Sequence, residues 1–282
     1  MEQFNLDEFL KYAIQEDIGD GDHTSNSTIP AEATGKARLL VKDEGIIAGI
    51  SIAKRVFELI DPNLEFQQVL NDGDAIKHGD VAFFVTGSSR SIVTAERLAL
   101  NIMQRMSGIA TQTNKITQAI AHTKCKLLDT RKTTPGFRYF EKLAVKIGGG
   151  VNHRFGLYDM ILVKDNHIDY AGGVHEALAQ ISSYLKEKNK SLLIEVEART
   201  LSDVMKILDS GIAFRILLDN FTPALLKEAV GLIDGRVQTE ASGGINEENV
   251  VAYAETGVDF ISMGALTHQI KSLDLSLKAV SA

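Results

Sequence analysis

Hydrophobic and polar positions alternate over short intervals in residues 1–90. Short apolar runs are separated by turn-forming sequences such as Asn71-Asp72-Gly73-Asp74 and His78-Gly79-Asp80. This pattern predicts a helix over 51–60 and strands at 36–43, 45–50, 64–70 and 81–87. The next segment, 91–107, carries an apolar stripe that includes Val93, Leu100 and Met103, which predicts a long helix. The first third of the chain is therefore expected to be a mixed α+β domain.

From residue 126 onward the pattern becomes a regular alternation of apolar runs and amphipathic segments. The runs predict six strands, at 126–130, 159–165, 192–198, 214–220, 237–242 and 260–264. Between them lie predicted helices, among them 173–188, 200–211 and 246–257. Strands that alternate with helices are typical of βαβ units and a parallel sheet, either open or closed into a barrel. Neither GxGxxG nor GxxxxGK[ST] occurs, so dinucleotide-binding and P-loop sites are not indicated.

Composition narrows the class of protein. Of 282 residues, 44% are apolar and 24% are charged, as in soluble globular proteins. No apolar stretch of about 18 residues occurs, and the start lacks the basic and apolar regions of a secretory leader, so we expect a cytoplasmic protein without a membrane span. The single Cys125 excludes an internal disulfide and is expected to be a buried apolar residue. The acidic segment 16–25 lacks the EF-hand glycine and distal glutamate, which favours a capped turn over a calcium loop.

Charge is distributed unevenly. The net charge of −7 argues against a nucleic-acid-binding surface. Residues 131–154 nevertheless carry six basic side chains against one acid, Glu141; the basic residues are Arg131, Lys132, Arg138, Lys142, Lys146 and Arg154. A solvated helix face would account for Lys142 and Lys146. It would not account for the basic residues in loops, and these predict a small, highly anionic ligand.

Polar residues end each of the six predicted strands. The ends are Asp129-Thr130-Arg131-Lys132, Lys164-Asp165-Asn166-His167, Glu195 to Glu197, Asp219-Asn220, Ser242-Gly243-Gly244 and Met263-Gly264-Ala265. In barrels of parallel strands the ligand site lies at the carboxyl ends of the strands. Unpaired buried charges would be costly, so we expect these groups to face one another or a ligand.

The last two strand ends predict a phosphate site. Ser242-Gly243-Gly244 precedes a helix expected to begin near Asn246, and this arrangement offers backbone N–H groups and a positive helix terminus. Gly264-Ala265 offers a second set of N–H groups. Glycine pairs are usually turns, and only their place in the strand order favours a phosphate site here.

The charged strand ends suit different parts of a ligand. Glu197 and Asp219 suit ribose hydroxyls or a magnesium–pyrophosphate group, although pairing with a neighbouring lysine is the simpler alternative. Arg131, Arg154 and Lys164 suit carboxylates. A structural role is as good an interpretation for His153, and the same applies to His167 and His268. No HxH or HExxH pair occurs, so a zinc site is not indicated.

Several motifs together resemble the quinolinate phosphoribosyltransferase family. They are EDIGDGDHTS (16–25), AERLALNIMQRMSGIAT (95–111), DTRKTTPGFR (129–138), GGGVNHRFGLYDMILVKDNH (148–167), EVE (195–197), LLDNF (217–221), EASGGI (240–245) and SMGALTH (262–268). The resemblance spans the whole chain, and the motifs match those of the family in order and spacing. It implies an N-terminal α/β sandwich domain over 1–112 and an α/β barrel of about six parallel strands over 113–268, with 269–282 returning to the N-terminal domain.

The resemblance also implies an activity and roles for matched residues. The family transfers the phosphoribosyl group of phosphoribosyl pyrophosphate (PRPP) to the ring nitrogen of quinolinate with decarboxylation, giving nicotinate mononucleotide, carbon dioxide and pyrophosphate in NAD biosynthesis. Lys132, Glu197 and Asp219 would be catalytic and would bind PRPP with Mg²⁺. The quinolinate residues would be Arg97, Thr130, Arg131, His153, Arg154 and Lys164. The phosphate residues would be Ser242, Gly243, Gly244, Gly264, Ala265 and Leu266.

The resemblance further implies a homodimer with shared active sites, sometimes assembled into a hexamer, in which Arg97 reaches the partner's site. The spacing to Asp219 leaves Glu195 as an alternative to Glu197. Three other functions stay open on the residues alone. One is a phosphate-binding barrel lyase or isomerase with Lys132 or Lys164 as a Schiff-base lysine. The second is a non-catalytic anion-binding protein, and the third is a nicotinate phosphoribosyltransferase.

Overall fold

The computed structural model describes residues 4–280, which fall into two compact units. The first unit contains the described residues up to Asn114, the segment Thr134–Gly149 and the residues from Gln269 onward, and the second contains Lys115–Thr133 and Gly150–His268. This division differs from the expected boundaries in the segment 134–149 and by two residues at 113–114. None of the described helices is both long and apolar enough to cross a membrane.

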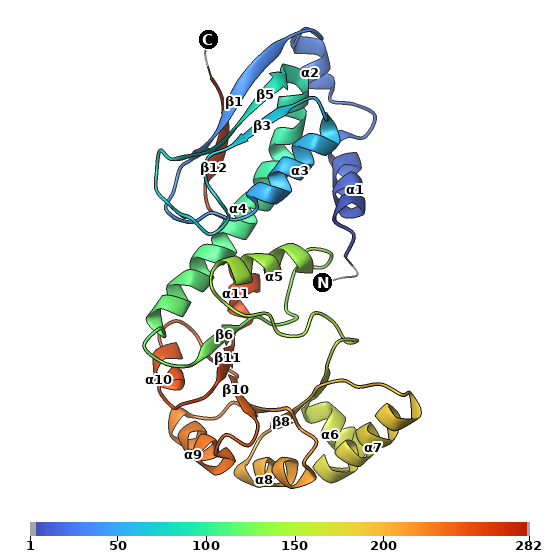
Figure 1. Cartoon of the computed structure of the whole chain (residues 1–282), viewed down its shortest axis with the longest axis vertical. Helices are drawn as coiled ribbons and strands as arrows, with labels where there is room; N and C mark the ends of the chain where they lie inside the picture. The colour runs from blue at the N-terminus through green and yellow to red at the C-terminus, as the bar shows by residue number, and fades with distance from the viewer. Residues whose placement is uncertain (1–3, 281–282) are drawn as a thin grey trace. The chain divides into compact units, whose positions relative to one another are not determined.

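A four-stranded antiparallel sheet forms the centre of the first unit, in the order β12–β1–β5–β3 (Figure 1). Its strands are β1 (Thr34–Val41), β3 (Glu65–Gln68), β5 (Val81–Ser88) and β12 (Leu275–Ala279). β1 buries Ala37, Leu39 and Val41 on one face, as the period of two requires. The last strand, β12, pairs with β1 along its length, so the end of the chain belongs to this unit. A small ladder joins β2 (Gly45–Ile46) to β4 (Ala75–Ile76).

Helices complete the first unit: α1 (Leu6–Ile18), α2 (His23–Thr28), α3 (Ile50–Ile60), α4 (Ser89–Ala119) and α5 (Arg138–Ile147). α4 is longer than the expected 91–107 and continues into the second unit. The acidic segment 16–25 forms the predicted turn, in which Asp22 caps α2 by accepting from the Ser25 N–H and also accepts from the Thr94 hydroxyl.

The placement of α5 corrects the prediction of a solvated basic helix face. Phe140 is fully buried, and its ring lies 4.5 Å from that of Phe137 and 4.9 Å from that of Phe9, centroid to centroid. Lys142 is also buried, at 1% exposure, whereas Lys146 is exposed as expected. Burial of this aromatic face against α1 explains why residues 134–149 belong to the first unit.

Six parallel strands form the second unit and confirm the predicted barrel. Their order is β6–β11–β10–β9–β8–β7, so β6 and β11, far apart in sequence, lie side by side (Figure 1). The strands are β6 (Lys126–Leu128), β7 (Ile161–Val163), β8 (Ile194–Ala198), β9 (Arg215–Asp219), β10 (Gln238–Ser242) and β11 (Phe260–Ser262). All six are shorter than expected, and β6 ends at Leu128, directly before the loop that carries the basic residues.

Helices connect these strands: α6 (Asp165–Ala171), α7 (Val174–Glu187), α8 (Leu201–Ser210), α9 (Pro223–Ile233), α10 (Val250–Ala254) and α11 (Ala265–His268). α7 and α8 match the predicted segments, but the helix expected from 246 begins only at Val250. The Asn246 side chain accepts from the Glu248 N–H, and the Asn249 side chain accepts from the Asn246 N–H. These local hydrogen bonds compete with helix formation and explain the shorter helix.

Candidate active site at the barrel mouth

Acidic side chains gather at the carboxyl ends of three neighbouring strands. Asp165 follows β7, Glu197 lies near the end of β8 and Asp219 ends β9. Burial, Asp219 and Asp165 raise the pKa of Glu197, while Lys164 lowers it. Burial also raises the pKa of Asp219, against the opposing effect of Lys164. Carboxylates that lie this close together favour a bound cation or hydrogen-bond donors, which stabilise their charged forms.

The loop after β6 presents Arg131 and Lys132 at the same mouth, where both are exposed. Two hydrogen bonds hold the backbone of this loop at Lys132. The Lys132 N–H donates to Thr130 Oγ1 at 2.9 Å, and the buried Thr267 hydroxyl donates to the Lys132 carbonyl at 2.6 Å. A Cβ atom on Gly264 would lie 2.8 Å from Lys132 Cδ, so the lysine chain runs directly over this glycine.

Arg154 adds a further cation from the loop before β7. Its NH1 donates to the Met160 carbonyl at 3.0 Å, and burial and the nearby Arg131 lower its pKa. Arginine stays protonated at neutral pH even when its pKa is lowered, so the charges of Arg154 and Arg131 repel each other. An anion bound beside both would relieve this repulsion. The pair therefore suits a ligand with carboxylate groups.

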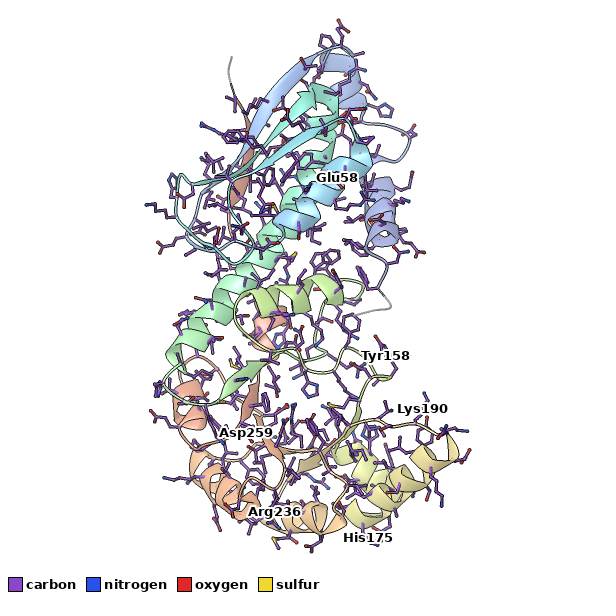
Figure 2. All side chains as sticks on the ribbon, in the orientation of Figure 1. Glu58, Tyr158, His175, Lys190, Arg236 and Asp259 are labelled. Atoms are coloured by element: carbon purple, nitrogen blue, oxygen red, sulfur yellow. The ribbon has the colours of Figure 1, made fainter. Side chains whose placement is uncertain are left out.

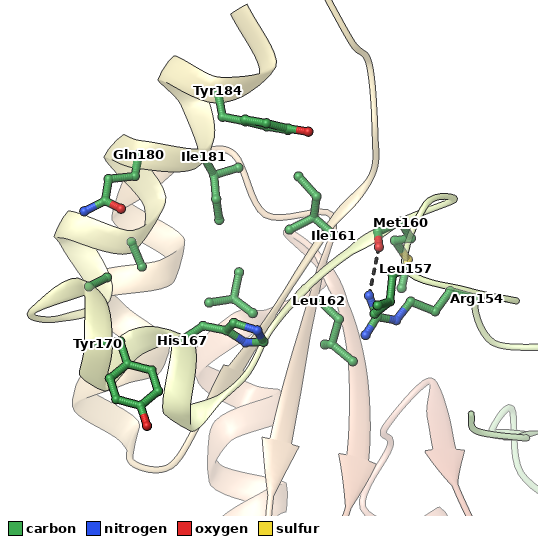
Figure 3. Close-up of a pocket in the computed structure, with 13 residues that line it drawn as sticks. Arg154, Leu157, Met160, Ile161, Leu162, His167, Tyr170, Gln180, Ile181 and Tyr184 are labelled. Atoms are coloured by element: carbon green, nitrogen blue, oxygen red, sulfur yellow. Dashed lines mark hydrogen bonds between the residues drawn. The ribbon is translucent and has the colours of Figure 1, made fainter. Parts of the chain in front are cut away.

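Beside the mouth lies a cavity of about 530 Å³ on the β7 side of the barrel (Figure 3). Arg154 contributes to its wall, and the other lining residues come from the 157–160 loop, β7, α6 and α7, with Ile161, Ile181 and Tyr184 among them. The lining is mostly apolar. The charged mouth, rather than this cavity, is therefore the candidate site for an anionic substrate.

One layer below the mouth, a buried histidine meets two buried glutamates. His153 Nε2 lies 3.0 Å from Glu195 Oε2 and 3.4 Å from Glu240 Oε2, and all three side chains are at most 6% exposed. His153 Nδ1 accepts the Arg154 N–H at 2.7 Å, so the proton of the neutral ring lies on Nε2 and points toward Glu195.

The protonation of this cluster is shared. Burial lowers the pKa of His153, but hydrogen bonds to Glu195 and Glu240 outweigh it and raise the pKa to about 9. Burial and the charge of Glu240 raise the pKa of Glu195 to about 7. The cluster therefore retains an extra proton at neutral pH. Because Nδ1 accepts the Arg154 N–H, the titrating protons of the cluster lie between Nε2 and the two carboxyl groups.

Arg215 on β9 balances the two carboxylates from below. Its NH1 lies 3.0 Å from Glu240 Oε2 and 3.8 Å from Glu195 Oε2, and its NH2 donates to Gln238 at 2.9 Å. The guanidinium also lies 4.3 Å from the centroid of the Phe260 ring. His153, Glu195 and Glu240 have the ligand types and spacing of a metal site. Because Arg215 already supplies the positive charge, we interpret the four residues as a hydrogen-bonded ion network, hereafter the buried network.

The glycine loop after β10 has the backbone shape that a phosphate site needs. Gly243 and Gly244 have φ of +94° and +63°, in the left-handed region that favours glycine. The helices that follow the two loops are short, with α10 at five residues and α11 at four. The expected contribution of a helix dipole is therefore unsupported, and loop N–H groups are what this region offers an anion.

Comparison with known proteins matches both units. The family model for the C-terminal domain of quinolinate phosphoribosyl transferase matches residues 109–278, and that for the N-terminal domain matches residues 22–107. The chain belongs to the quinolinate phosphoribosyltransferase family. The mitochondrial quinolinate phosphoribosyltransferase [decarboxylating] 2b of Nicotiana tabacum is 47% identical over 98% of this chain and 82% of its own length.

Bacterial relatives are similar as well. The probable nicotinate-nucleotide pyrophosphorylase [carboxylating] of Bacillus subtilis is 41% identical, over 98% of this chain and 94% of its own. The crystal structure of NadC from Streptococcus pyogenes has a TM-score of 0.92 and 38% identity, over 98% of this chain and 97% of that one. This quinolinate phosphoribosyltransferase fold is thus matched over nearly its whole length.

Within the barrel of this family member, most predicted site residues lie at one edge. The residues that end or directly follow strands of the six-stranded sheet are Thr130, Arg131, Lys132, Lys164, Glu197, Asp219, Ser242–Gly244 and Gly264–Leu266. Arg154 comes from the loop before β7 and lies near Arg131. His153 differs because its ring lies in the buried network. Arg97 is exposed on α4 in the first unit, and its proposed role in a partner's site stays a prediction.

The sequence patterns assigned no specific role to several residues that shape this site. Buried Asp129 accepts from the His153 N–H at 2.8 Å and from the Asn152 amide at 2.6 Å. Thr267 anchors the Lys132 loop, and Arg215 and Glu240 complete the buried network. A charged residue inside a strand was the available signal for Arg215 and Glu240.

Proposed function

We propose that this chain transfers the phosphoribosyl group of PRPP to the ring nitrogen of quinolinate and decarboxylates the product to nicotinate mononucleotide. The observation that carries the proposal is the charge pattern of one barrel mouth in a chain of this family. Cations from the loops around residues 131 and 154 lie at the same edge as Lys164, Glu197 and Asp219. Such a mouth fits one dicarboxylate and one sugar phosphate together.

Quinolinate, with adjacent carboxylates, takes the cationic side in this proposal. Arg131 and Arg154 contact the carboxylates, Lys164 approaches from the end of β7, and Thr130 supplies a hydroxyl. Arginine is suited to this task because its fork of N–H donors binds a carboxylate in a bidentate manner. Arg97 of the partner subunit completes the set in a homodimer with shared sites.

PRPP takes the acidic side and the glycine loops. Glu197 and Asp219 accept from the ribose hydroxyls, and Lys132 contacts the pyrophosphate. Ser242, Gly243, Gly244, Gly264, Ala265 and Leu266 hold the 5′-phosphate with N–H and hydroxyl donors. The raised pKa values of Glu197 and Asp219 support this assignment, because positive charge at this point relieves the repulsion between them.

Magnesium fits the same residues. Carboxylate oxygens are the hard ligands that Mg²⁺ prefers, and Glu197 and Asp219 are the residues that would lie near it when it is bound with PRPP. When present, the ion would neutralise charge on the pyrophosphate.

The chemistry follows from position and charge. The C1′–oxygen bond of PRPP breaks and its electron pair leaves with pyrophosphate, while the ring nitrogen forms a bond to C1′. The nitrogen becomes positive and stabilises the electron pair left on C2 when the 2-carboxylate departs as carbon dioxide. That carbon then takes up a proton. The residues orient the two substrates and stabilise charge, and no protein nucleophile is required.

The proposal includes a location in the cytoplasm and leaves a hexamer as a further assembly of the dimer. Relatives of this chain include proteins named as mitochondrial, so fractionation of the source cells is the direct measurement of location.

Activity is tested by incubation with quinolinate, PRPP and Mg²⁺, with detection of nicotinate mononucleotide and carbon dioxide. We expect one carbon dioxide for each nucleotide formed. Nicotinate, which lacks one carboxylate, leaves a cation unpaired and should lose about 2–4 kcal/mol in kcat/KM. Comparable kcat/KM values for the two acids would contradict the proposal.

A further inference from the structure

The buried network is an unusual filling for a barrel. Interiors of parallel barrels are packed mainly with branched apolar side chains. Here His153, Glu195, Glu240 and Arg215 lie in the interior, with side chains at most 10% exposed. A buried ion network is weak evidence for stability, since apolar side chains of similar volume often serve as well. Its position next to the mouth therefore calls for a role in the site.

Contacts of the network lead upward to a single peptide of the mouth. Glu195 orients the His153 ring through Nε2, and Nδ1 of the same ring accepts the Arg154 N–H. On the other side, Asp129 accepts the His153 N–H. The backbone of residues 153 and 154 is thus held from both flanks. Arg154 in turn directs its guanidinium along the Met160 carbonyl.

The surroundings of Glu195 would affect two substitutions, by glutamine and by aspartate, differently. Both carboxylate oxygens of Glu195 are buried, and within residues 4–280 neither makes a hydrogen bond of good geometry, although Oε2 lies 3.0 Å from His153 Nε2. A glutamine could keep an oxygen toward Nε2 and turn its NH₂ group toward Glu240, whose carboxyl lies within hydrogen-bond reach of Glu195. An aspartate would keep the charge but withdraw the acceptor by one methylene.

We propose that Glu195, supported by Glu240 and Arg215, is a positioning residue for quinolinate: it fixes the His153 ring, which fixes the Arg154 backbone and aims its guanidinium at a substrate carboxylate. This inference rests on the proposed function. It does not require Glu195 to touch either substrate, and it separates Glu195 from Glu197, which lies two residues further along β8 at the mouth.

Two variants of one residue test the proposal. If acceptor position matters, Glu195→Asp should raise the quinolinate Kd on the order of tenfold or more, while Glu195→Gln should retain most of the affinity. The KM for PRPP should change by less than about threefold in both, because the network leads to the quinolinate side only. Quinolinate binding is measured by calorimetry without PRPP, and the PRPP KM by steady-state kinetics.

Asp259→Asn is the matched control. Asp259 is a partly buried carboxylate of the same barrel, paired with Lys124 and Thr239 at the amino end of β11 (labelled in Figure 2). Its loss should lower stability without changing the quinolinate Kd. The inference is overturned if Glu195→Asp binds quinolinate with the Kd of the wild type, or if Glu195→Gln binds it more weakly than Glu195→Asp. It is also overturned if the KM for PRPP rises by the same factor as the quinolinate Kd. A wild-type protein without turnover of quinolinate would instead refute the proposed function.

Discussion

Glu195 and Glu197 show how one strand assigns two equal side chains to different tasks. They are two residues apart on β8, so both point to the same face of the sheet. Glu195 meets His153 below the mouth, whereas Glu197 feels Asp219 and Asp165 at the mouth. We therefore propose Glu197 as the carboxylate that faces ribose or magnesium, and Glu195 as the residue that supports the loop carrying Arg154.

At this scale we predict that Glu197→Gln and Asp219→Asn impair the use of PRPP more than the binding of quinolinate. Each change keeps the shape of the side chain and removes a charge placed near the ribose and its magnesium. We expect a loss of kcat/KM for PRPP on the order of 10²-fold, with the calorimetric Kd for quinolinate little changed. A collapse of quinolinate affinity with intact PRPP kinetics would mean that the two roles are reversed.

A second residue-scale prediction concerns Asp259. Burial raises its pKa, but hydrogen bonds from Lys124 and Thr239 outweigh this and leave the pKa below that of an ordinary aspartate. A carboxyl group whose pKa is lowered in the folded state stabilises the fold at any pH above its pKa in the unfolded state. This stability is lost as the pH falls through the pKa of the folded state. Asp259→Asn should thus lower the free energy of unfolding by about 1–2 kcal/mol at pH 7.

The difference should shrink as urea denaturation is repeated from pH 5 downward. Asp209→Asn is the control, because Asp209 is exposed on α8 and should change stability by less than about 0.5 kcal/mol. A destabilisation by Asp259→Asn that stays constant with pH would show that the carboxylate charge is not its cause.

At the scale of elements, the loops after β10 and β11 depend on close backbone packing. Asn220 donates its N–H to the Ser242 carbonyl at 2.8 Å, and a Cβ on Gly243 would lie 2.9 Å from that same nitrogen. Because backbone cannot yield as a long side chain can, the loop shape requires glycine here. At Gly264 the neighbour is the flexible Lys132 chain, which has more freedom to move.

We therefore predict that Gly243→Ala weakens PRPP use and stability together. The left-handed φ alone costs about 1 kcal/mol, and the clash with Asn220 adds to it. Gly211→Ala is the matched control, since Gly211 has φ of +66° at the end of α8 with open space around it. That variant should lose similar stability from strain and keep the PRPP KM of the wild type. Equal PRPP kinetics in both variants would argue against a phosphate contact at Gly243.

At the scale of the whole molecule, the division into units raises the question of where Arg97 acts. Arg97 lies on α4 in the first unit, whereas the mouth belongs to the second. A two-fold dimer lets each subunit contribute to its partner's site. In this proposal the dimer therefore supplies a substrate-binding residue to each active site, in addition to any effect that it has on stability.

The prediction is complementation between inactive variants. If Arg97 completes the partner's site, unfolding and reassembly of Arg97→Ala with Arg131→Ala gives mixed dimers with one intact site each. About a quarter of wild-type activity should then return at equal mixing. Absence of recovery, with mixed dimers shown by mass spectrometry, would refute the shared-site arrangement.

The sequence by itself determined the parts of this protein that depend on local pattern. The six barrel strands, α7, α8 and the capped turn at Asp22 follow from apolar periodicity and turn residues, whose effects act over a few positions. The order of the motifs indicated the family, and the rule for barrel strand ends predicted that Lys132, Lys164, Glu197 and Asp219 lie at one edge.

Tertiary structure decided what depends on contacts between residues far apart in the chain. Lys142 is buried on α5 whereas Lys146 is exposed, and the surroundings of His153 depend on Glu195 and Glu240, which lie on strands 42 and 87 positions later. The sequence pattern of β8 cannot distinguish Glu195 from Glu197, because the two lie on the same face of one strand. Their depth in the barrel is set by the register of the neighbouring strands. Register and helix docking arise from the packing of the whole unit, and no local pattern carries that information.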